Sequence, residues 1–334
     1  MMRQRLRINL VLISATLFLL FFSACSEKKQ PAEEVTYRLK WLFNISVVGD
    51  LWAEAHGNFT RHGLKVNLKP GGPEKDAIKE LEMGHAQFGV ASADQVIRAV
   101  SKGSPIVVLA QLFQVNPLHW IYRPDRTPLK TPLDLKGKTI GITYGGNDET
   151  IMRALLAKYD ITEDQVKLYS VRYDYTPFYQ GKVDLWPLYR NAQAPIIGEK
   201  LRKAGERFDL MSPSGLGIRF VANSVITTQK MLDERPETVK RFMKALVEAW
   251  REALSPENKD KAIETVLKYN PETPADIVAK QLPATRILML PAKDSKFGKI
   301  DLAAWQQTEK IMLDQKLITA PVNIENRLKP LVDR

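Results

Sequence analysis

The sequence predicts an α/β protein of two lobes, each built on a mostly parallel sheet flanked by helices. Segments of strand type alternate with segments of helix type along most of the chain, which is typical of parallel sheets covered on both faces. Of 334 residues, about 300 remain once the N-terminal apolar segment is set aside. A chain of this length usually forms more than one hydrophobic core. A stretch rich in proline and charge, residues 123–136, is followed by a second run of the same alternation.

The first run has the features of strands and helices in regular succession. Residues 106–111 are continuously apolar, as expected of a buried strand, whereas residues 64–68 alternate. Gly57 would stop the first helix, and Pro-Gly-Gly-Pro at residues 70–73 would turn the chain after the second strand. The expected strands are 36–41, 64–68, 87–91 and 106–111, and the expected helices are 48–56, 75–83 and 93–101.

The second run repeats this outline. The expected strands are 138–142, 166–171 and 183–187, and the expected helix is 148–159. Residues 84–89, Gly-His-Ala-Gln-Phe-Gly, and residues 181–186, Gly-Lys-Val-Asp-Leu-Trp, occupy matching places and each leads into a strand. This correspondence indicates that the two lobes are similar.

The last third of the chain is expected to return to the first lobe through a strand at 218–226. Pro236 suits the first turn of a helix over 236–254. Apolar side chains recur there at helical spacing and predict core packing: Val239, Phe242, Met243, Leu246, Val247 and Trp250. Further helices are expected at 259–268 and 303–313. The expected division is 36–122 with 219–334 for lobe 1, and 123–218 for lobe 2.

The N-terminus has the three zones of a secretion signal. Arg3, Arg5 and Arg7 form a positive region, and a mostly apolar segment of about 15 residues, 8–22, follows it. Phe22-Ser23-Ala24-Cys25 then resembles the lipobox of bacterial lipoproteins, although Phe22 replaces the usual leucine. We therefore expect a signal peptide over 1–25, cut before Cys25 and acylated on that cysteine. An uncut anchor helix is the alternative.

Residues 26–35 are largely polar and without periodicity, so we expect a flexible tether that keeps the protein at a membrane. The location would be the periplasm or the cell surface. The net charge is +11, and removal of the three signal arginines leaves 11 − 3 = +8. The basic residues are dispersed, which favours a surface near anionic lipid and disfavours nucleic acid as a partner.

The motifs of common enzymes are absent from the sequence. Cys25 is the single cysteine, which excludes an intramolecular disulfide and a cysteine-based metal site. The histidines lack zinc spacing, and the chain has no phosphate loop, nucleophile elbow or dinucleotide-binding glycine motif. We expect no catalytic residue, no metal and no cofactor, and these absences increase the weight of a binding protein.

Polar and aromatic residues follow several expected strands, where ligands bind in open α/β sheets. Trp41 and Asn44 follow the first strand, Ser92 follows the third, and Asn116 lies beyond the fourth. Gln111, Gln114 and Trp120 surround the same crossing.

The turn Gly145-Gly146-Asn147 joins a strand to a helix and is the most suggestive feature. Its glycines let the backbone approach a ligand, and the helix N-terminus offers N–H donors. Helix capping by Asn147 is the alternative. Asp148 and Glu149 lie in the first turn, where they would repel an anion, so we expect a neutral or cationic ligand.

Several aromatic residues indicate a pocket for a flat ring, and core packing is the alternative for each of them. They are Trp41, Trp120, Tyr173, Tyr175, Phe178, Tyr179, Trp186 and Tyr189. Asp174 and Asn191 place polar groups beside them. Asp174 and Asp184 have the alternative of being turn residues or partners of Arg172 and Arg190.

These segments, in this order, resemble the solute-binding proteins of ABC importers for thiamine pyrimidine precursors, riboflavin, alkanesulfonates, taurine and nitrate. The resemblance covers about residues 36–270 and is carried by residues 39–44, 70–72, 88–95, 134–141, 181–184 and 235–239. It implies a two-lobed periplasmic-binding-protein fold of type II, with a ligand cleft between the lobes. The candidates carried over by position are Trp41, Asn44, Ser92, Asn116, Asn147, Asp174, Tyr189 and Asn191.

The resemblance also implies the partners, namely a small-molecule ligand and the permease and ATPase subunits of an importer, for a monomeric binding protein. The segment 41–44 is most similar to the pyrimidine and flavin branch, which implies a flat heteroaromatic ligand. Three alternatives stay open: a sulfonate, taurine or nitrate ligand, a ligand-sensing lipoprotein, and an enzyme similar to thiamine pyrimidine synthases. The synthases carry a cysteine-rich motif that this chain lacks.

Overall fold

The computed structural model describes residues 32–72, 74–172 and 174–331. The expected signal peptide, residues 1–25, lies outside the described residues, as does Cys25. The expected tether over 26–35 overlaps the first strand, because β1 begins at Glu33. Arg235 and Arg241 both pair with the Glu33 carboxylate, and Thr238 donates a hydrogen bond to it at 2.7 Å. These contacts fix the start of β1 to the long helix α10.

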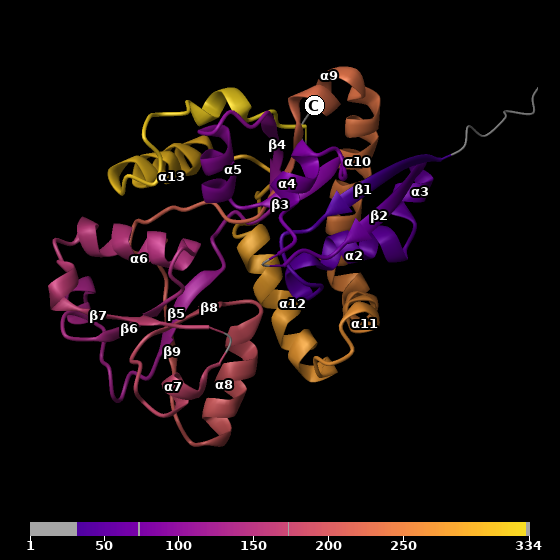
Figure 1. The fold of residues 1–334 in the computed structure, drawn as a ribbon. Helices are drawn as coiled ribbons and strands as arrows, with labels where there is room; N and C mark the ends of the chain where they lie inside the picture. The colour runs from indigo at the N-terminus through magenta and orange to yellow at the C-terminus, as the bar shows by residue number, and fades with distance from the viewer. Residues whose placement is uncertain (1–31, 73, 173, 332–334) are drawn as a thin grey trace, which may run out of the picture. The chain divides into compact units, whose positions relative to one another are not determined.

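A five-stranded sheet has the order β2-β1-β3-β10-β4 (Figure 1). Its strands are β1 (Glu33–Arg38), β2 (Leu64–Lys69), β3 (Phe88–Ala91), β4 (Ile106–Gln111) and β10 (Ser224–Thr228). β1 runs parallel to β2 and β3, whereas β10 runs antiparallel to β3 and β4. The expected strand 218–226 therefore starts later than the sequence indicated, at Ser224.

The middle of the chain forms a second group of strands. These are β5 (Leu118–Tyr122), β6 (Thr139–Ile142), β7 (Lys167–Ser170), β8 (Trp186–Tyr189) and β9 (Asp209–Met211). β5 pairs antiparallel with β8 and β9, and β6 pairs parallel with β7. A parallel bridge between Ile140 and Leu185, with Gly141 N donating to Leu185 O at 2.8 Å, connects β6 and β7 to the three strands β8, β5 and β9. The combined order is β7-β6-β8-β5-β9, which we describe as the second sheet.

The two sheets share one topology, as the repeated sequence pattern indicated. In each, the strand next to the last comes from the opposite half of the chain and runs antiparallel to both neighbours: β10 in the first sheet and β5 in the second. The segments 84–89 and 181–186 lead into the equivalent strands β3 and β8. Four strands of each sheet thus run in one direction, as expected of mostly parallel sheets, and the exchanged strand alone runs in the opposite direction.

The exchange of β5 bears on the expected boundary at residue 122. That boundary falls after β5, whose hydrogen bonds belong to the second sheet. The chain passes between the sheets at 112–117, after β4, and at 212–223, before β10. The sequence did not predict a strand at 118–122, because these residues adjoin the polar residues of the crossing and lack a clear alternation.

Helices cover both faces of each sheet. Along β4, Val107 and Leu109 join the core with helices α2 and α10, while Ile106 and Val108 join the core with α5 and α13. The long helices are α2 (Val48–Ala55), α5 (Ala93–Val100), α6 (Asn147–Lys158), α8 (Gln193–Lys203), α10 (Pro236–Ala253), α11 (Lys259–Tyr269), α12 (Ala275–Met289) and α13 (Leu302–Asp314). The short ones are η1 (Ile45–Val47), α3 (Asn58–Arg61), α4 (Ala77–Glu82), η2 (Pro132–Leu135), η3 (Glu163–Gln165), α7 (Thr176–Tyr179), α9 (Gln229–Glu234), η4 (Pro256–Asn258) and η5 (Ile324–Arg327).

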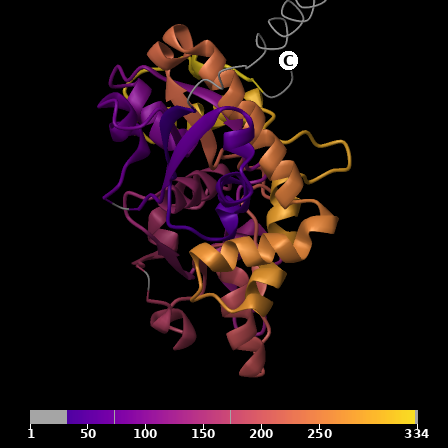
Figure 2. The same cartoon turned by 90° about the vertical axis from the view of Figure 1, so that its right-hand side faces the viewer.

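The apolar stripe of α10 packs as predicted, against α2 and α3 (Figure 2). Phe242 stacks on Phe88 with ring centroids 3.7 Å apart and meets the edge of Tyr37. Pro236 is the first residue of the helix. A backbone N–H at that position would have no partner within the helix, so proline costs no hydrogen bond there.

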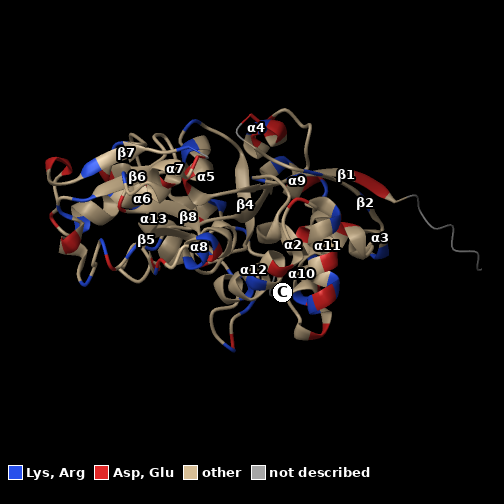
Figure 3. Cartoon of the chain, turned by 90° about the horizontal axis from the view of Figure 1, so that it is seen from below, with Lys and Arg blue, Asp and Glu red and all other residues tan. Residues whose placement is uncertain are grey.

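Two long helices, α8 and α12, were not anticipated. α12 contains Pro283, which argues against a helix in a sequence pattern, yet it continues to Met289. It contacts both η1 and α8, so it lies against elements of both sheets (Figure 1). Basic and acidic residues are interspersed over the elements, as the dispersed charge in the sequence indicated (Figure 3). Within the described part of the chain, every helix is too short or too polar to span a bilayer.

Candidate functional site

A cavity of about 430 Å³ lies where loops of both sheets meet. It is lined by Lys40, Trp41, Asn44, Ser46, Val47, Thr143, Gly146, Asn147, Asp148, Val171, Arg172, Tyr189, Ala192, Gln193 and Asn223. The lining follows the ends of β1, β6, β7 and β8. Asn223 precedes β10, and Ser224 pairs with Gln111 at the end of β4, so it lies at the same sheet edge. The cavity therefore lies at the carboxyl ends of parallel strands, the usual place for ligands in α/β sheets.

The loop that carries Trp41 is held by the turn at residues 70–72. Gly71 N donates to Trp41 O at 2.9 Å. A Cβ on Gly71 would lie 2.1 Å from Leu39 O, so only glycine permits this approach. The Asn44 side chain stabilises the same loop, because Oδ1 accepts from Ser46 N at 2.7 Å and Nδ2 donates to Leu42 O at 2.9 Å.

The turn before α6 adopts the conformation that its glycines allow. Gly145 has φ +79°, in the left-handed region, and Gly146 is the N-cap of the helix. Asn147 is the first helical residue and makes no capping hydrogen bond, which contradicts the capping alternative. Its side-chain Nδ2 is buried and has no hydrogen-bond partner among the described residues.

Of the acidic pair beside this turn, Asp148 lines the cavity and Glu149 does not. Asp148 Oδ2 accepts from Thr143 N at 2.6 Å, and Glu149 accepts from Gly145 N at 2.7 Å and pairs with Arg153 at 2.8 Å. Both carboxylates thus stabilise the turn by accepting hydrogen bonds from its backbone N–H groups. Burial raises the pKa of Asp148, and hydrogen bonds from Thr143 partly oppose this.

The sequence missed several lining residues. Asn223 is 5% exposed, and its Oδ1 has no hydrogen-bond partner among the described residues. No sequence signal placed it, since the direction of β10 follows from the strand exchange. Lys40 and Arg172 also line the cavity, and each follows shortly after the end of a strand. The rule that ligands bind at the carboxyl ends of strands would have identified both residues.

Five predicted residues line the cavity: Trp41, Asn44, Gly146, Asn147 and Tyr189. Gly145 adjoins it without lining it. Ser92 forms a capping box with Gln95 at the start of α5. The Asp174 carboxylate accepts from Thr176 N at 2.9 Å on an exposed turn, the structural alternative considered for it.

Asn116 and Asn191 connect segments beside the cavity. Asn116 Nδ2 donates to Phe220 O at 2.8 Å, which joins the two crossings between the sheets. Asn191 is fully buried, and its Nδ2 lies 3.0 Å from both Ser46 Oγ and Thr285 Oγ1. Ser46 follows β1 and Thr285 belongs to α12, so Asn191 ties the end of β8 to elements of the other sheet.

Most of the aromatic residues belong to the cores. Trp120, Phe178 and Trp186 are buried, and Trp120 Nε1 donates to Gly141 O at 2.9 Å, which ties β5 to β6. Trp41 and Tyr189 line the cavity. Tyr173 lies outside the described residues.

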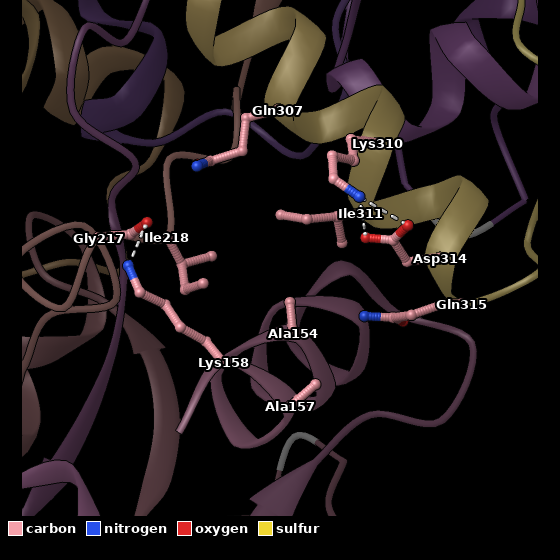
Figure 4. Close-up of a pocket in the computed structure, with 10 residues that line it drawn as sticks. All are labelled: Ala154, Ala157, Lys158, Gly217, Ile218, Gln307, Lys310, Ile311, Asp314 and Gln315. Atoms are coloured by element: carbon pink, nitrogen blue, oxygen red, sulfur yellow. Dashed lines mark hydrogen bonds and ion pairs between the residues drawn. The ribbon is translucent and has the colours of Figure 1, made fainter. Parts of the chain in front are cut away.

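A second cavity of about 430 Å³ lies between α6, α13 and the loop at Gly217 (Figure 4). Its walls are mainly apolar, and its charged groups pair locally. Lys158 Nζ donates to Gly217 O at 3.2 Å, and Lys310 pairs with Asp314 at 2.9 Å. Buried unpaired polar atoms distinguish the cavity at the strand ends from this one. In the described ranges, no three histidine, cysteine or acidic residues gather as a metal site would require.

Comparisons with known proteins agree with this architecture. The riboflavin-binding protein RibY of Chloroflexus aurantiacus is 23% identical over 322 residues, which cover 91% of this chain and 87% of that protein. The formylaminopyrimidine-binding protein of Halalkalibacterium halodurans is 21% identical over 96% of this chain and 98% of its own. A yeast 4-amino-5-hydroxymethyl-2-methylpyrimidine phosphate synthase, THI13 of Saccharomyces cerevisiae, is 24% identical over 75% of each chain.

Among solved structures, the periplasmic aliphatic sulphonate binding protein SsuA from Escherichia coli superposes with a TM-score of 0.70 at 17% identity. The alignment covers 89% of this chain and 92% of that one. It confirms the predicted fold class, a periplasmic-binding-protein fold with helices on mixed sheets. The model of the NMT1/THI5 like family matches residues 44–259, more than half of the chain. The resemblance inferred from the sequence is thereby confirmed, and the chain belongs to the NMT1/THI5-like family.

Proposed function

We propose that this protein is the substrate-binding component of an ABC importer and captures a small, flat heteroaromatic molecule between two lobes. The cavity at the strand ends carries the proposal. It combines two aromatic side chains, Trp41 and Tyr189, with two buried amide atoms that lack partners, Asn147 Nδ2 and Asn223 Oδ1. Its volume of about 430 Å³ lies in the range of small-molecule sites.

The chemistry of the lining favours a ring with polar edges. An aromatic contact adds about 0.5–1.5 kcal/mol beyond area burial. A buried amide atom without a partner costs about 1–3 kcal/mol, and a ligand that satisfies it recovers that cost on binding. Asn147 Nδ2 requires an acceptor and Asn223 Oδ1 a donor. A heterocycle that offers both meets these demands, and a bare hydrocarbon ring does not.

The relatives support the same ligand class. The two binding proteins compared above are named for riboflavin and a formylaminopyrimidine, both flat heterocycles, and each aligns over most of its length. In our proposal the lobes meet at the crossings 112–117 and 212–223, and Asn191 with α12 holds them together around the ligand.

Differential scanning fluorimetry of the purified protein, followed by calorimetry, tests the ligand class. Thiamine-type pyrimidine precursors and riboflavin form one arm, and taurine, an alkanesulfonate and nitrate form the other. We expect stabilisation by a heteroaromatic compound. Stabilisation by the sulfonates or nitrate alone would refute the heteroaromatic choice and leave the alternative binding protein in its place.

We propose binding without catalysis, although the yeast synthase is a relative. Mass spectrometry of ligand released after prolonged incubation checks this, and a changed ligand mass would contradict it. A monomer is expected in light scattering, with or without ligand.

We further propose export and lipid anchoring through Cys25, with residues 26–32 as the tether to β1. This rests on the sequence of the first 25 residues. A processed, acylated form in membranes is the expected result. Retention of Cys25→Ser in membranes at full precursor size would favour an uncut anchor helix instead. Co-purification with a permease and an ATPase would support import, whereas a sensor receptor as partner would support ligand sensing.

A further inference from the structure

Two basic residues line the cavity at the strand ends, one from the loops of each sheet. Lys40 follows β1 and Arg172 follows β7, and both line the same cavity. Within residues 32–72, 74–172 and 174–331, neither forms an ion pair, whereas most other arginines in that part of the chain do. A long side chain with an unpaired charge beside a cavity is available to a ligand.

The acidic groups nearby do not neutralise these cations. Asp148 is the single carboxylate among the described lining residues, and a backbone N–H of Thr143 holds it at 2.6 Å. Burial raises the pKa of Asp148, and the hydrogen bonds from Thr143 oppose this. Glu149 is occupied by Gly145 and Arg153. The two cations Lys40 and Arg172 outnumber the one carboxylate of the lining, so the formal charge of the lining is positive.

Two further features complement a negative group. The N-terminus of the twelve-residue helix α6 borders the cavity through Gly146 and Asn147, and helix N-termini favour anions. Asn147 Nδ2 is a buried donor without a partner. Asn223 Oδ1, buried and also without a partner, needs a donor instead. One cavity thus presents both an anion-binding region and an acceptor for a ring N–H, NH2 or hydroxyl.

We infer that the ligand is an anionic heteroaromatic, whose phosphate, sulfonate or carboxylate is held by Lys40, Arg172 and the start of α6 while Asn223 binds the ring. The inference rests on the proposed function and narrows its ligand class. It reverses the expectation of a neutral or cationic ligand, which depended on repulsion of an anion by Asp148 and Glu149 in the first turn of α6.

Matched ligand pairs that differ only in one charged group test this inference by calorimetry. Riboflavin and its 5′-phosphate form one pair, and a hydroxymethylpyrimidine and its phosphate ester form the other. We expect the phosphate ester in at least one pair to bind at least about tenfold more tightly at low salt. That preference should shrink at high salt, because mobile ions screen exposed charges.

Variants locate the charge effect. Arg172→Gln and Lys40→Gln should each reduce the preference for the ester, measured as the ratio of its affinity to that of the neutral compound, by several-fold. Arg190→Gln is the matched control, since Arg190 is exposed and adjoins Tyr189 but does not line the cavity. Its preference should equal that of the parent.

The outcomes separate the two proposals. Equal binding of neutral and anionic compounds, or an equal effect of Arg190→Gln, would overturn the anionic class while heteroaromatic binding stood. Binding of inorganic phosphate or taurine as tightly as the esters would overturn the role of the ring. Binding of neither member of any pair would overturn the proposed function itself.

Discussion

Asp50 provides a test of how the core beneath the cavity responds to pH. It lies in α2, three residues after the lining residue Val47, and is fully buried. Tyr37 Oη donates to Asp50 Oδ1 at 2.7 Å, while Oδ2 has no hydrogen-bond partner among the described residues. Burial raises the pKa of Asp50 from 3.8 to about 7, and the Tyr37 hydrogen bond partly opposes this.

The sign of the effect follows from linkage. The native protein holds the Asp50 proton up to about pH 7, whereas the unfolded chain releases it near pH 4. The native state therefore binds more protons in this window, and its stability falls as pH rises from about 4 to about 7. At 1.36 kcal/mol per pKa unit, the full cost above pH 7 is about 4 kcal/mol. Between about pH 5 and about pH 8, the loss is between about 2 and 3 kcal/mol.

Asp50→Asn removes the titrating group and keeps its shape. The free energy of unfolding is measured in urea at about pH 5 and about pH 8. Between these pH values the parent should lose between about 2 and 3 kcal/mol more stability than the variant. Asp164→Asn, on the exposed turn η3, is the control and should follow the parent. If Asp50→Asn and the parent lost stability equally over this range, burial would not set the charge state of Asp50.

Three other changes probe the site and its supports. Trp41→Ala should weaken ligand affinity about tenfold or more in calorimetry. The loss of stability should be relatively smaller, because the ring is only half-buried. Equal binding by variant and parent would show that Trp41 does not belong to the site. Asn191→Ala should lower the free energy of unfolding by about 2–4 kcal/mol, since it removes hydrogen bonds such as that to Ser46 and opens a buried space. An unchanged midpoint in urea would show that the hydrogen bonds of Asn191 do not stabilise the protein. Glu309→Gln should cost about 1.5–3 kcal/mol, because its buried carboxylate accepts from backbone N–H groups over 322–324, and hydrogen exchange there should accelerate.

The sequence predicted the elements whose periodicity is strong. The helix at 236–254 and the strand at 106–111 lie almost where the pattern placed them. The rule that ligands bind at strand ends brought Trp41, Asn147 and Tyr189 to one cavity. These successes depend on local pattern and on the general geometry of α/β sheets.

What the sequence did not give depends on long-range contacts. The strand β5 and the position of Asn223 before β10 follow from strand exchange between the sheets, and no local pattern encodes that exchange. The orientation of Asp148 depends on a hydrogen bond to Thr143, which an expectation based on the helix dipole overlooked. The helix over 275–289 was hidden by Pro283.

The exchanged strands have a consequence for how this protein comes apart. A fragment that ended near residue 112 would lack β10, which would leave one edge of β3 open and β4 without a partner strand, with their N–H and C=O groups open to other chains. The middle segment alone, cut out at residues 123 and 212, would lack β5 between β8 and β9. Neither half is a transplantable module, so the two sheets should melt in one transition, and a truncated gene should yield aggregates rather than a working half.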